Sequence, residues 1–181
     1  MMHNQALQIE LYTDGGVIGS NPSKAGGTWA FRVIQDGKVT NQYSGIVTPE
    51  QMGLPYITNN LTEMRAVVRG LLTVSYIHPD FAGTVYSDSM VTLGRIFCGW
   101  KWSGIPPVLR NEFNEARAGL KQWEKIRWVL LDGHPTHAHL AAGIGKHGHA
   151  VSLHNVWCDK ECGRLAAQYK KGTAILEGAQ S

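Results

Sequence analysis

The sequence predicts an α/β fold in which antiparallel strands are followed by alternating helices and strands. Three observations support this prediction. Segments with alternating polar and apolar residues open the chain, apolar residues recur at helical spacing over residues 60–77, and short apolar strands alternate with helices in the second half. The 181 residues are ample for one well-packed α/β domain and few for two, so we expect a single domain with a core over about residues 7–171.

Composition excludes several classes of protein. Hydrophobic residues make up 43% of the chain and charged residues 17%, and no apolar run approaches the roughly 18 residues that a membrane span needs. The chain starts without the basic leader and apolar segment of a secretory signal, and its cysteines (Cys98, Cys158 and Cys162) are not spaced like a secreted disulfide framework. We therefore expect a cytoplasmic protein without membrane contact. The net charge of +3 is compatible with a phosphate polymer as partner but does not by itself indicate one.

The first three strands are predicted from a two-residue periodicity. Residues 7–12 alternate and lead into Asp14-Gly15-Gly16, a pattern typical of a half-buried strand that enters a flexible turn. Residues 27–34 and 38–46 flank an Asp-Gly pair, which is a strong hairpin signal between alternating segments. The opening of the chain is therefore expected to be antiparallel.

The middle of the chain carries the clearest helix and a strand that leads into a helix. Apolar residues follow helical spacing from residue 60 to 77, where His78-Pro79 ends the pattern. A short strand over 83–86 is followed by Asp88 and a helix over 90–98. Asp88 is thus expected at the carboxyl end of a strand, where sites in α/β sheets usually lie.

The last third combines regular elements with a histidine-rich segment. We expect a helix over 108–124, a strand over 127–131 and a last helix over 156–171. Between the strand and the last helix, six of the eight histidines occur with little apolar periodicity, which predicts a mobile loop over 132–154. Residues 172–181 are expected to form a flexible tail.

Four acidic residues stand where a predicted strand ends or a helix begins: Asp14, Glu63, Asp88 and Asp159. Together they suggest a divalent-metal site, because hard cations prefer oxygen ligands. Each also has a structural explanation. Asp14 could form a turn, Glu63 and Asp88 could cap helices, and Asp159 could interact with a helix dipole.

The four acids stand in short motifs: Thr13-Asp14-Gly15, Thr58-Asn59-Asn60 with Glu63 three residues later, Ser87-Asp88-Ser89, and Asn155 four residues before Asp159 with Cys158 beside it. Any one of these motifs alone would be unspecific. Together, in this order, they resemble type 1 ribonuclease H, and the resemblance covers about residues 7–171. It implies an RNase H fold, with a five-stranded mixed sheet of three antiparallel and then two parallel strands flanked by helices.

The resemblance implies an endonuclease that hydrolyses the RNA strand of RNA/DNA hybrids and leaves 3′-hydroxyl and 5′-phosphate ends. It implies two Mg²⁺ ions, with Mn²⁺ as a substitute, whose four positive charges the four carboxylates would neutralise. Asp14 would bridge both ions, Glu63 and Asp88 would complete one site, and Asp159 would hold the other. Glu63 would also lie near the ribose 2′-hydroxyl. The protein is expected to act as a monomer.

The resemblance also implies residues around the metal site. His134, in Asp132-Gly133-His134, stands where the family has a histidine that assists proton movement or product release. This chain has a longer loop, however, so that His137, His139, His147, His149 and His154 compete for the role. The expected contacts with the hybrid are Gly15, Asn21, Asn59, Asn60, Lys101 and Asn155.

Two departures from the family pattern concern substrate binding. Met90 stands where the family often has a glutamine, which removes one expected contact in the groove of the hybrid. Residues 100–107 lack the basic helical handle that grips the DNA strand in many bacterial members. Lys101, Arg110, Lys121 and Lys125 are the candidates to replace it. Trp100 and Trp102 could stack on the substrate or belong to the core.

Three alternatives stay open. His154, Cys158 and Cys162 are spaced by four and could bind zinc, although structural zinc sites usually wrap a turn around the ion. The fold could serve another nuclease or a strand-transfer enzyme, against which the spacing from Asn59-Asn60 to Glu63 and the single-domain length argue. The third alternative is a nucleic-acid-binding module without catalysis, which the presence of all four acids disfavours.

Overall fold

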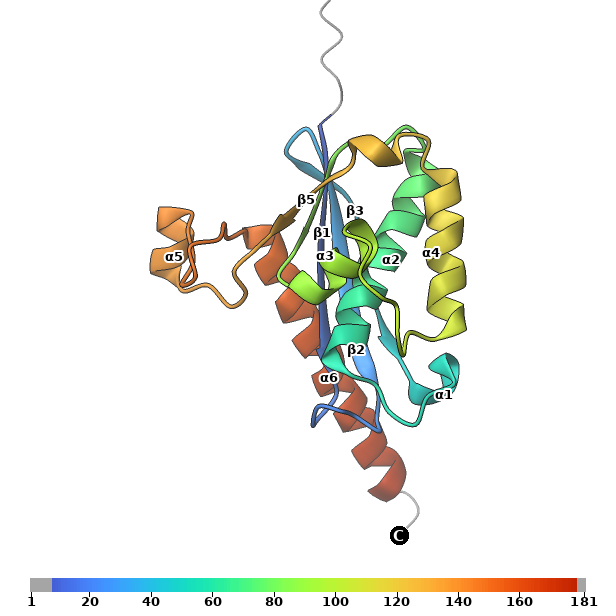
Figure 1. Cartoon of the computed structure of the whole chain (residues 1–181). Coiled ribbons are helices and arrows are strands. Elements are labelled where there is room, and N and C mark those ends of the chain that lie inside the picture. Colours follow the sequence, from blue (N-terminus) through green and yellow to red (C-terminus); the bar gives the residue numbers. More distant parts are fainter. Residues whose placement is uncertain (1–7, 179–181) are drawn as a thin grey trace, which may run out of the picture.

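The centre of the molecule is a five-stranded sheet with strand order β3-β2-β1-β4-β5 (Figure 1). The computed structural model describes the backbone of residues 8–178 and the side chains of residues 8–172. Strands β1, β2 and β3 are antiparallel, whereas β4 runs parallel to β1 and β5 parallel to β4. The mixed sheet expected from the resemblance is thus confirmed. The strands are β1 (Ile9–Val17), β2 (Gly27–Gln35), β3 (Lys38–Val47), β4 (Thr84–Ser87) and β5 (Arg127–Leu130).

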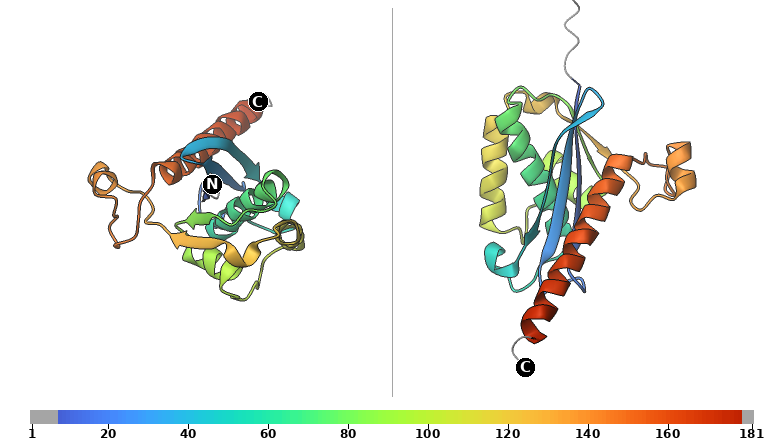
Figure 2. Two further views of the ribbon diagram at one scale, coloured as in Figure 1. Left: turned by 90° about the horizontal axis from the view of Figure 1, so that it is seen from above. Right: turned by 180° about the vertical axis from the view of Figure 1, so that it is seen from behind.

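Helices cover both faces of the sheet. Figure 2 shows α2 and α4 on one face and α6 crossing the other, in agreement with the contacts of α6 with β1, β2 and β3. A short helix α1, a 3-10 turn η1 and a small helix α5 lie in the connections. None of the helices in the described part of the chain combines the length and apolarity needed to cross a membrane. The helices are α1 (Pro49–Met52), α2 (Asn59–Ile77), α3 (Met90–Phe97), α4 (Pro107–Gly119), η1 (Trp123–Lys125), α5 (His137–Ala142) and α6 (Leu153–Gly178).

The main core lies between the sheet and α2. The Thr58 side chain accepts a hydrogen bond from the Leu61 amide and so caps the start of the helix. Met64, Val68 and Leu71, at helical spacing, are fully buried against the sheet. Burying one such side chain stabilises the fold by roughly 1.5–3 kcal/mol, so the apolar stripe anchors α2 on the sheet.

A second, smaller core lies beneath α6. Cys158 and Cys162 are buried there, and their Sγ atoms lie 3.7 Å and 3.6 Å from the carbonyl oxygens of Tyr12 and Asp14. Burial raises the pKa of the Cys158 thiol well above its ordinary value, so this side chain acts as a small apolar group. These contacts fix the rotation of α6 over β1.

Strand β1 differs from the sequence prediction. The predicted turn at Asp14-Gly15-Gly16 is wrong, because β1 continues to Val17 and pairs Asp14 with Ala30 of β2. The glycine at position 15 has a packing reason, since a Cβ there would lie 2.3 Å from the Glu63 backbone nitrogen. Gly15 therefore permits the close approach of β1 and α2.

The ends of other elements also differ from the predicted bounds. The helix predicted over 108–124 ends at Gly119, after which η1 forms a separate turn. The last helix begins three residues earlier than predicted and continues through 172–178, so these residues are not the expected tail. Residue 7 of the predicted first strand and residues 179–181 of the predicted tail lie outside the described residues.

The histidine-rich segment is not a wholly irregular loop. Helix α5 forms within it, capped by the Thr136 side chain, and projects away from the sheet (Figures 1 and 2). Isolated bridges pair Ala150 with both Leu131 and Ile144. The far end of the segment thus returns to the end of β5.

Candidate active site

The four predicted acids come together in one open pocket of about 450 Å³. Asp14 projects from the middle of β1, and Glu63 lies in α2. Asp88 follows β4, and Asp159 belongs to α6, which reaches the pocket from the other side of the sheet. The pocket is also lined by Gly15, Gly16, Asn59, Asn60, Ser89, Met90, Val91 and His134.

Three of the acids form a compact inner cluster. One carboxylate oxygen each of Asp14, Glu63 and Asp88 can be chosen so that all three lie within 4.8 Å of one another. Asp14 and Glu63 are each 5% exposed, while Asp88 is half-buried. Asp159 lies outside this cluster, with 44% of its side chain exposed. The pocket therefore has a buried inner wall and a solvated outer carboxylate.

Burial and mutual repulsion disturb the ionisation of the inner acids. Burial raises the pKa of Asp14 well above its ordinary value, and the charge of Asp88 raises it further. The pKa of Glu63 is also raised well above its usual range, first by burial and then by the charges of Asp14 and Asp88. Burial is also the main cause of the raised pKa of Asp88. The metal-free cluster therefore binds protons more tightly than ordinary carboxylates do.

The hydrogen bonds of the cluster leave oxygens for a cation. The Gly15 amide donates to Asp14 Oδ1 at 2.7 Å, and Asn59 Nδ2 donates to Glu63 Oε1 at 3.3 Å. Glu63 Oε2 and Asp88 Oδ1 are buried without a hydrogen-bond partner among the described residues. Buried polar atoms are normally paired, and hard divalent cations prefer carboxylate oxygens. The inner cluster therefore fits a divalent cation such as Mg²⁺.

The zinc alternative finds no support in the geometry. Within residues 8–172, the inner acidic cluster is the only group of three His, Cys, Asp or Glu side chains close enough to hold a metal. Cys158 and Cys162 face the backbone of β1, and the His154 ring packs on Tyr12 with centroids 5.0 Å apart. The three side chains serve the second core instead.

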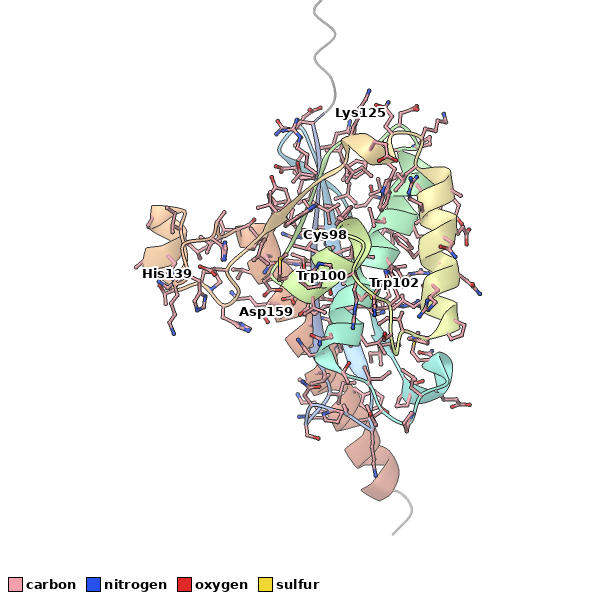
Figure 3. All side chains as sticks on the ribbon, viewed as in Figure 1. Cys98, Trp100, Trp102, Lys125, His139 and Asp159 are labelled. Carbon is pink, nitrogen blue, oxygen red and sulfur yellow. The ribbon has the colours of Figure 1, made fainter. Side chains whose placement is uncertain are left out.

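Of the six histidines in the segment, His134 is the one that lines the acidic pocket within the described structure. Its Nδ1 lies 3.5 Å from Asp159 Oδ2, and 81% of its side chain is exposed. His139 lies on the projecting α5, away from Asp159 (Figure 3). His147 and His149 line a neighbouring pocket that also includes His134. The structure thus distinguishes His134 from its five competitors by position.

Some of the predicted substrate contacts line the acidic pocket and others do not. Gly15, Asn59 and Asn60 line the acidic pocket. Asn21 lies beside it, and its Oδ1 accepts a hydrogen bond from the Asn59 amide at 3.2 Å. Lys101 is exposed on the connection after α3 and lines neither the acidic pocket nor the pocket that shares Asn60 with it.

Asn155 is not brought to the pocket. Its side chain is 3% exposed and is absent from the pocket lining. The physical reason is the early start of α6 at Leu153, which places Asn155 in the first turn of the helix and turns it into the protein. The Asn155 side chain therefore has no surface to offer to a substrate in this arrangement.

Two residues near the pocket were not selected by sequence reasoning. Asp132 stands two residues after the end of β5 and is only 5% exposed. The signal that could have identified it is its position near a strand end, which also marks Asp88. Arg95 lines a pocket of about 330 Å³ that shares Asn60 with the acidic pocket. Nothing in the spacing of α3 distinguishes Arg95 from an ordinary surface arginine.

The tryptophans after α3 differ in their exposure. Trp102 is half-buried, packs against Phe113 of α4 with ring centroids 4.7 Å apart, and donates from Nε1 to the Arg95 carbonyl (Figure 3). Trp100 is 45% exposed and lies against Gly94 of α3. Trp102 is thus part of the structure that supports α3, whereas the exposed face of Trp100 is open to solvent.

Comparisons with known proteins agree with this geometry. Residues 6–162 match the model of the family described as RNase H. The chain is 30% identical over 166 residues to the ribonuclease H of Rhodopirellula baltica, covering 89% of this chain and 92% of that protein. It is 29% identical over 135 residues to the ribonuclease H of Aromatoleum aromaticum, covering 72% of this chain and 81% of the relative.

Solved structures show the same fold. The N-terminal RNase H domain of a Mycobacterium tuberculosis protein superposes with a TM-score of 0.61 at 17% identity, covering 93% of this chain and 99% of that chain. LC11-RNase H1, solved in complex with an RNA/DNA hybrid, superposes with a TM-score of 0.53 at 19% identity, covering 70% of this chain and 86% of that chain. At these identities the likeness concerns the fold alone.

Proposed function

The chain belongs to the RNase H family of nucleases, and from this premise we propose that it hydrolyses the RNA strand of RNA/DNA hybrids with two divalent cations. The products would carry 3′-hydroxyl and 5′-phosphate ends. One observation carries the proposal: Asp14, Glu63 and Asp88 converge in a pocket, and two of their buried oxygens have no partner among the described residues. Mg²⁺ is the proposed ion, with Mn²⁺ as a substitute.

The four acids would hold the ions from different sides of the pocket. Bound there, two divalent cations supply a water nucleophile and stabilise the departing 3′ oxygen. Asp14 is the proposed shared ligand because it belongs to the inner cluster and its pKa also responds to the charge of Asp159. Glu63 and Asp88 would complete the inner site, and the exposed Asp159 would serve the outer one.

His134 is the proposed proton carrier of the reaction. It lies at the outer side of the pocket, beside Asp159, and its exposed ring can exchange protons with solvent. A histidine ring can both accept and donate a proton, which suits it to take a proton from the attacking water or to give one to the departing oxygen.

We propose that the buried inner wall of the acidic pocket recognises the RNA strand. Asn59 contacts Glu63 and shares the pocket with Asn60 and Gly15. These groups offer donors and acceptors at the place where a ribose 2′-hydroxyl would distinguish RNA from DNA. Asn21 would support this wall by fixing the Asn59 backbone.

The DNA strand is assigned to the neighbouring pocket of about 330 Å³, which Thr58, Asn60 and Arg95 line. Two other candidates to replace the basic handle are engaged elsewhere. Arg110 donates to the carbonyls of Trp102 and Ile105, and Lys121 lies 3.5 Å from Asp80. No ion pair among the described side chains involves Arg95, so its guanidinium can serve a phosphate.

The proposal also includes a monomer in the cytoplasm. Cys98, Cys158 and Cys162 are free thiols, which is compatible with a reducing compartment. Light scattering of the purified protein tests the oligomeric state, and cell fractionation tests the location.

Cleavage of a labelled RNA/DNA hybrid, with and without chelator, tests the function. We expect cleavage that requires Mg²⁺, spares double-stranded RNA and branched DNA, and falls to background in Asp14→Asn. Glu50→Gln, which changes an exposed carboxylate on α1, is the matched control and should keep full activity. Survival of Mg²⁺-dependent cleavage in Asp14→Asn would contradict the proposal. Extension of the upstream RNA fragment by a polymerase reports the 3′-hydroxyl end.

A further inference from the structure

Asp132 joins the two ends of the histidine-rich segment. Its Oδ2 accepts hydrogen bonds from the backbone amides of His147 at 2.7 Å and His149 at 3.3 Å, and its Oδ1 lies 3.1 Å from His147 Nδ1. The Asp132 amide donates to the Ala150 carbonyl at 2.9 Å. One buried side chain at the end of β5 thus binds the returning 147–150 segment.

The chain is closely wrapped around this carboxylate. A Cβ at Gly145 would lie 2.4 Å from Asp132 Cβ, and the Gly145 amide donates to the His149 carbonyl at 2.8 Å. Most of the surroundings are exposed, and the His147 side chain itself is 71% exposed. The order of this turn therefore depends on the hydrogen bonds to Asp132 more than on apolar packing.

The backbone of residues 132–134 also lies against Asp88, one of the proposed metal ligands. A Cβ at Gly133 would lie 2.4 Å from Asp88 Oδ2, so the backbone between Asp132 and His134 runs directly against that carboxylate. His134 has φ of 51°, in the left-handed region that a residue with a side chain adopts when its surroundings hold it there. The His134 ring is mostly exposed, so packing of its side chain contributes little to this restraint, and the backbone before it runs against Asp88.

We propose that Asp132 is a positioning residue for the nuclease reaction, holding His134 beside Asp159 by binding the 147–150 segment. The catalytic consequence rests on the proposed function, whereas the positioning itself does not. A role confined to fold stability would lower the melting temperature without acting through His134. The two roles therefore predict different behaviour of the His134 ring and of double variants.

Proton-carbon NMR correlation spectra of the metal-free protein follow the His134 ring directly. In Asp132→Ala we expect the His134 signal to move toward the position of a solvated, unrestrained histidine and to lose its dependence on Asp159. His139→Ala, on the projecting α5, identifies another histidine signal and should leave the His134 signal unchanged. An unaltered His134 signal in a folded Asp132→Ala protein would overturn the proposal, whether or not the protein cleaves hybrids.

Hybrid cleavage provides the second arm. Asp132→Ala should lower kcat roughly tenfold or more with little change in KM, up to the loss seen in His134→Ala, since acid-base groups contribute about 10²–10⁴-fold. In the His134→Ala background, the Asp132→Ala change should cost less than about twofold, because both act as one unit. An equal loss in both backgrounds would mean that Asp132 does not act through His134.

Two milder variants keep the test decisive if Asp132→Ala fails to fold. Asp132→Asn retains the size but replaces one carboxylate oxygen with an NH2 group and removes the charge, which weakens the hydrogen bonds from the His147 and His149 amides. Gly145→Ala leaves the carboxylate in place and pushes the wrapped chain away from it. Both should shift the His134 signal in the same direction as Asp132→Ala, and an unchanged signal in both would reject the proposal. Absence of hybrid cleavage in the wild-type protein would reject the proposed function only.

Discussion

Glu63 and Asp14 place two carboxylates where water can hardly solvate them and where each faces the charge of the other. Hydration normally stabilises the ionised form, so its loss favours protonation. In the metal-free protein, the ionised carboxylates of these two residues therefore repel each other and destabilise the site. A divalent cation bound there would relieve that repulsion, so metal binding would be coupled to stability.

The first prediction concerns pH and stability in the presence of chelator. The pKa values of Asp14 and Glu63 are raised above their unfolded values, so the folded chain binds more protons than the unfolded chain above about pH 4. Their contribution to stability is therefore lost as pH rises from the ordinary carboxyl range through the raised pKa values. A tenfold difference in proton affinity between the folded and the unfolded chain corresponds to about 1.4 kcal/mol. Thermal unfolding from pH 4.5 to 8 measures this slope.

Asp14→Asn is the variant that tests this cause. It removes one charge from the cluster, so at neutral pH with chelator we expect a higher melting temperature than in the wild-type protein and a flatter dependence on pH. For a chain of this size, 1 kcal/mol corresponds to about 2–4 °C. Glu50→Gln should leave the pH dependence unchanged. A wild-type slope that persists in Asp14→Asn would show that other groups cause it.

The second prediction concerns the metal itself. Mg²⁺ should raise the melting temperature of the wild-type protein. At a Mg²⁺ concentration of a hundred times the Kd, the free energy of unfolding should increase by about 2.7 kcal/mol. Asp14→Asn should show a much smaller rise, because the variant lacks the central ligand of the inner cluster. Titration calorimetry measures the Kd. The same measurement with Ca²⁺, which has the same charge but a larger radius, shows whether the site selects by ion size or responds to charge alone. Equal stabilisation of both proteins would place the binding site elsewhere.

At the scale of elements, the site depends on the close approach of β1 and α2. The backbone of α2 at Glu63 lies so near β1 that position 15 has no room for a side chain. This approach brings the carboxylates of Asp14 and Glu63 together from elements almost 50 positions apart in the sequence. A glycine, rather than an acid, thus sets the spacing of the inner cluster.

The third prediction follows from that contact. Gly15→Ala should destabilise the protein by about 1–3 kcal/mol, the usual cost of overpacking, and should lower cleavage because α2 must move away from β1. Gly163→Ala is the matched control, since it lies in α6 with no other atom near its added Cβ. A helix interior favours alanine over glycine by about 1 kcal/mol, so this control should be more stable than the wild-type protein. Denaturant unfolding compares the two.

Sequence reasoning predicted elements whose signals are local and missed those that depend on distant partners. The apolar spacing of α2 and the hairpin between β2 and β3 are local, and both were predicted. The extension of β1 through Gly15 was not predicted, because the polar residues there form a strand only by pairing with β2.

The same distinction holds for the site. The four acids were predicted because their contexts resemble a known family, and the structure brings them to one pocket. Asp132 was missed because its partner His147 is 15 positions away, across a segment without periodicity. Asn155 was expected to contact substrate, but its burial depends on where α6 begins, which the sequence does not mark sharply.

At the scale of the whole molecule, the two strands of a hybrid require two binding regions. The acidic pocket and the Arg95 pocket meet at Asn60, at the start of α2. One region carries the acids proposed to hold cations, and the other presents Arg95, proposed to bind a phosphate. This arrangement suits a duplex that spans the molecule, with its RNA strand over the acids and its DNA strand over Arg95.

The fourth prediction tests this arrangement. Arg95→Ala should raise KM for the hybrid with little change in kcat, and should reduce the salt dependence of binding by about one phosphate contact. Arg117→Ala is the matched control, because Arg117 of α4 is paired with Glu124 of η1 and lines neither pocket. Lys101→Ala tests the remaining basic residue of the connection. A salt dependence of Arg95→Ala equal to that of the wild-type protein would remove Arg95 from the interface.

Strand β1 has β2 on one side and β4 on the other. Its pairing with β2 continues to Val17, but its pairing with β4 stops at Tyr12. Asp14 therefore lies where β1 keeps a paired strand on one side only, and its carboxylate lines the acidic pocket together with that of Asp88, which follows β4. The end of the parallel pairing thus marks the position of the site along the sheet.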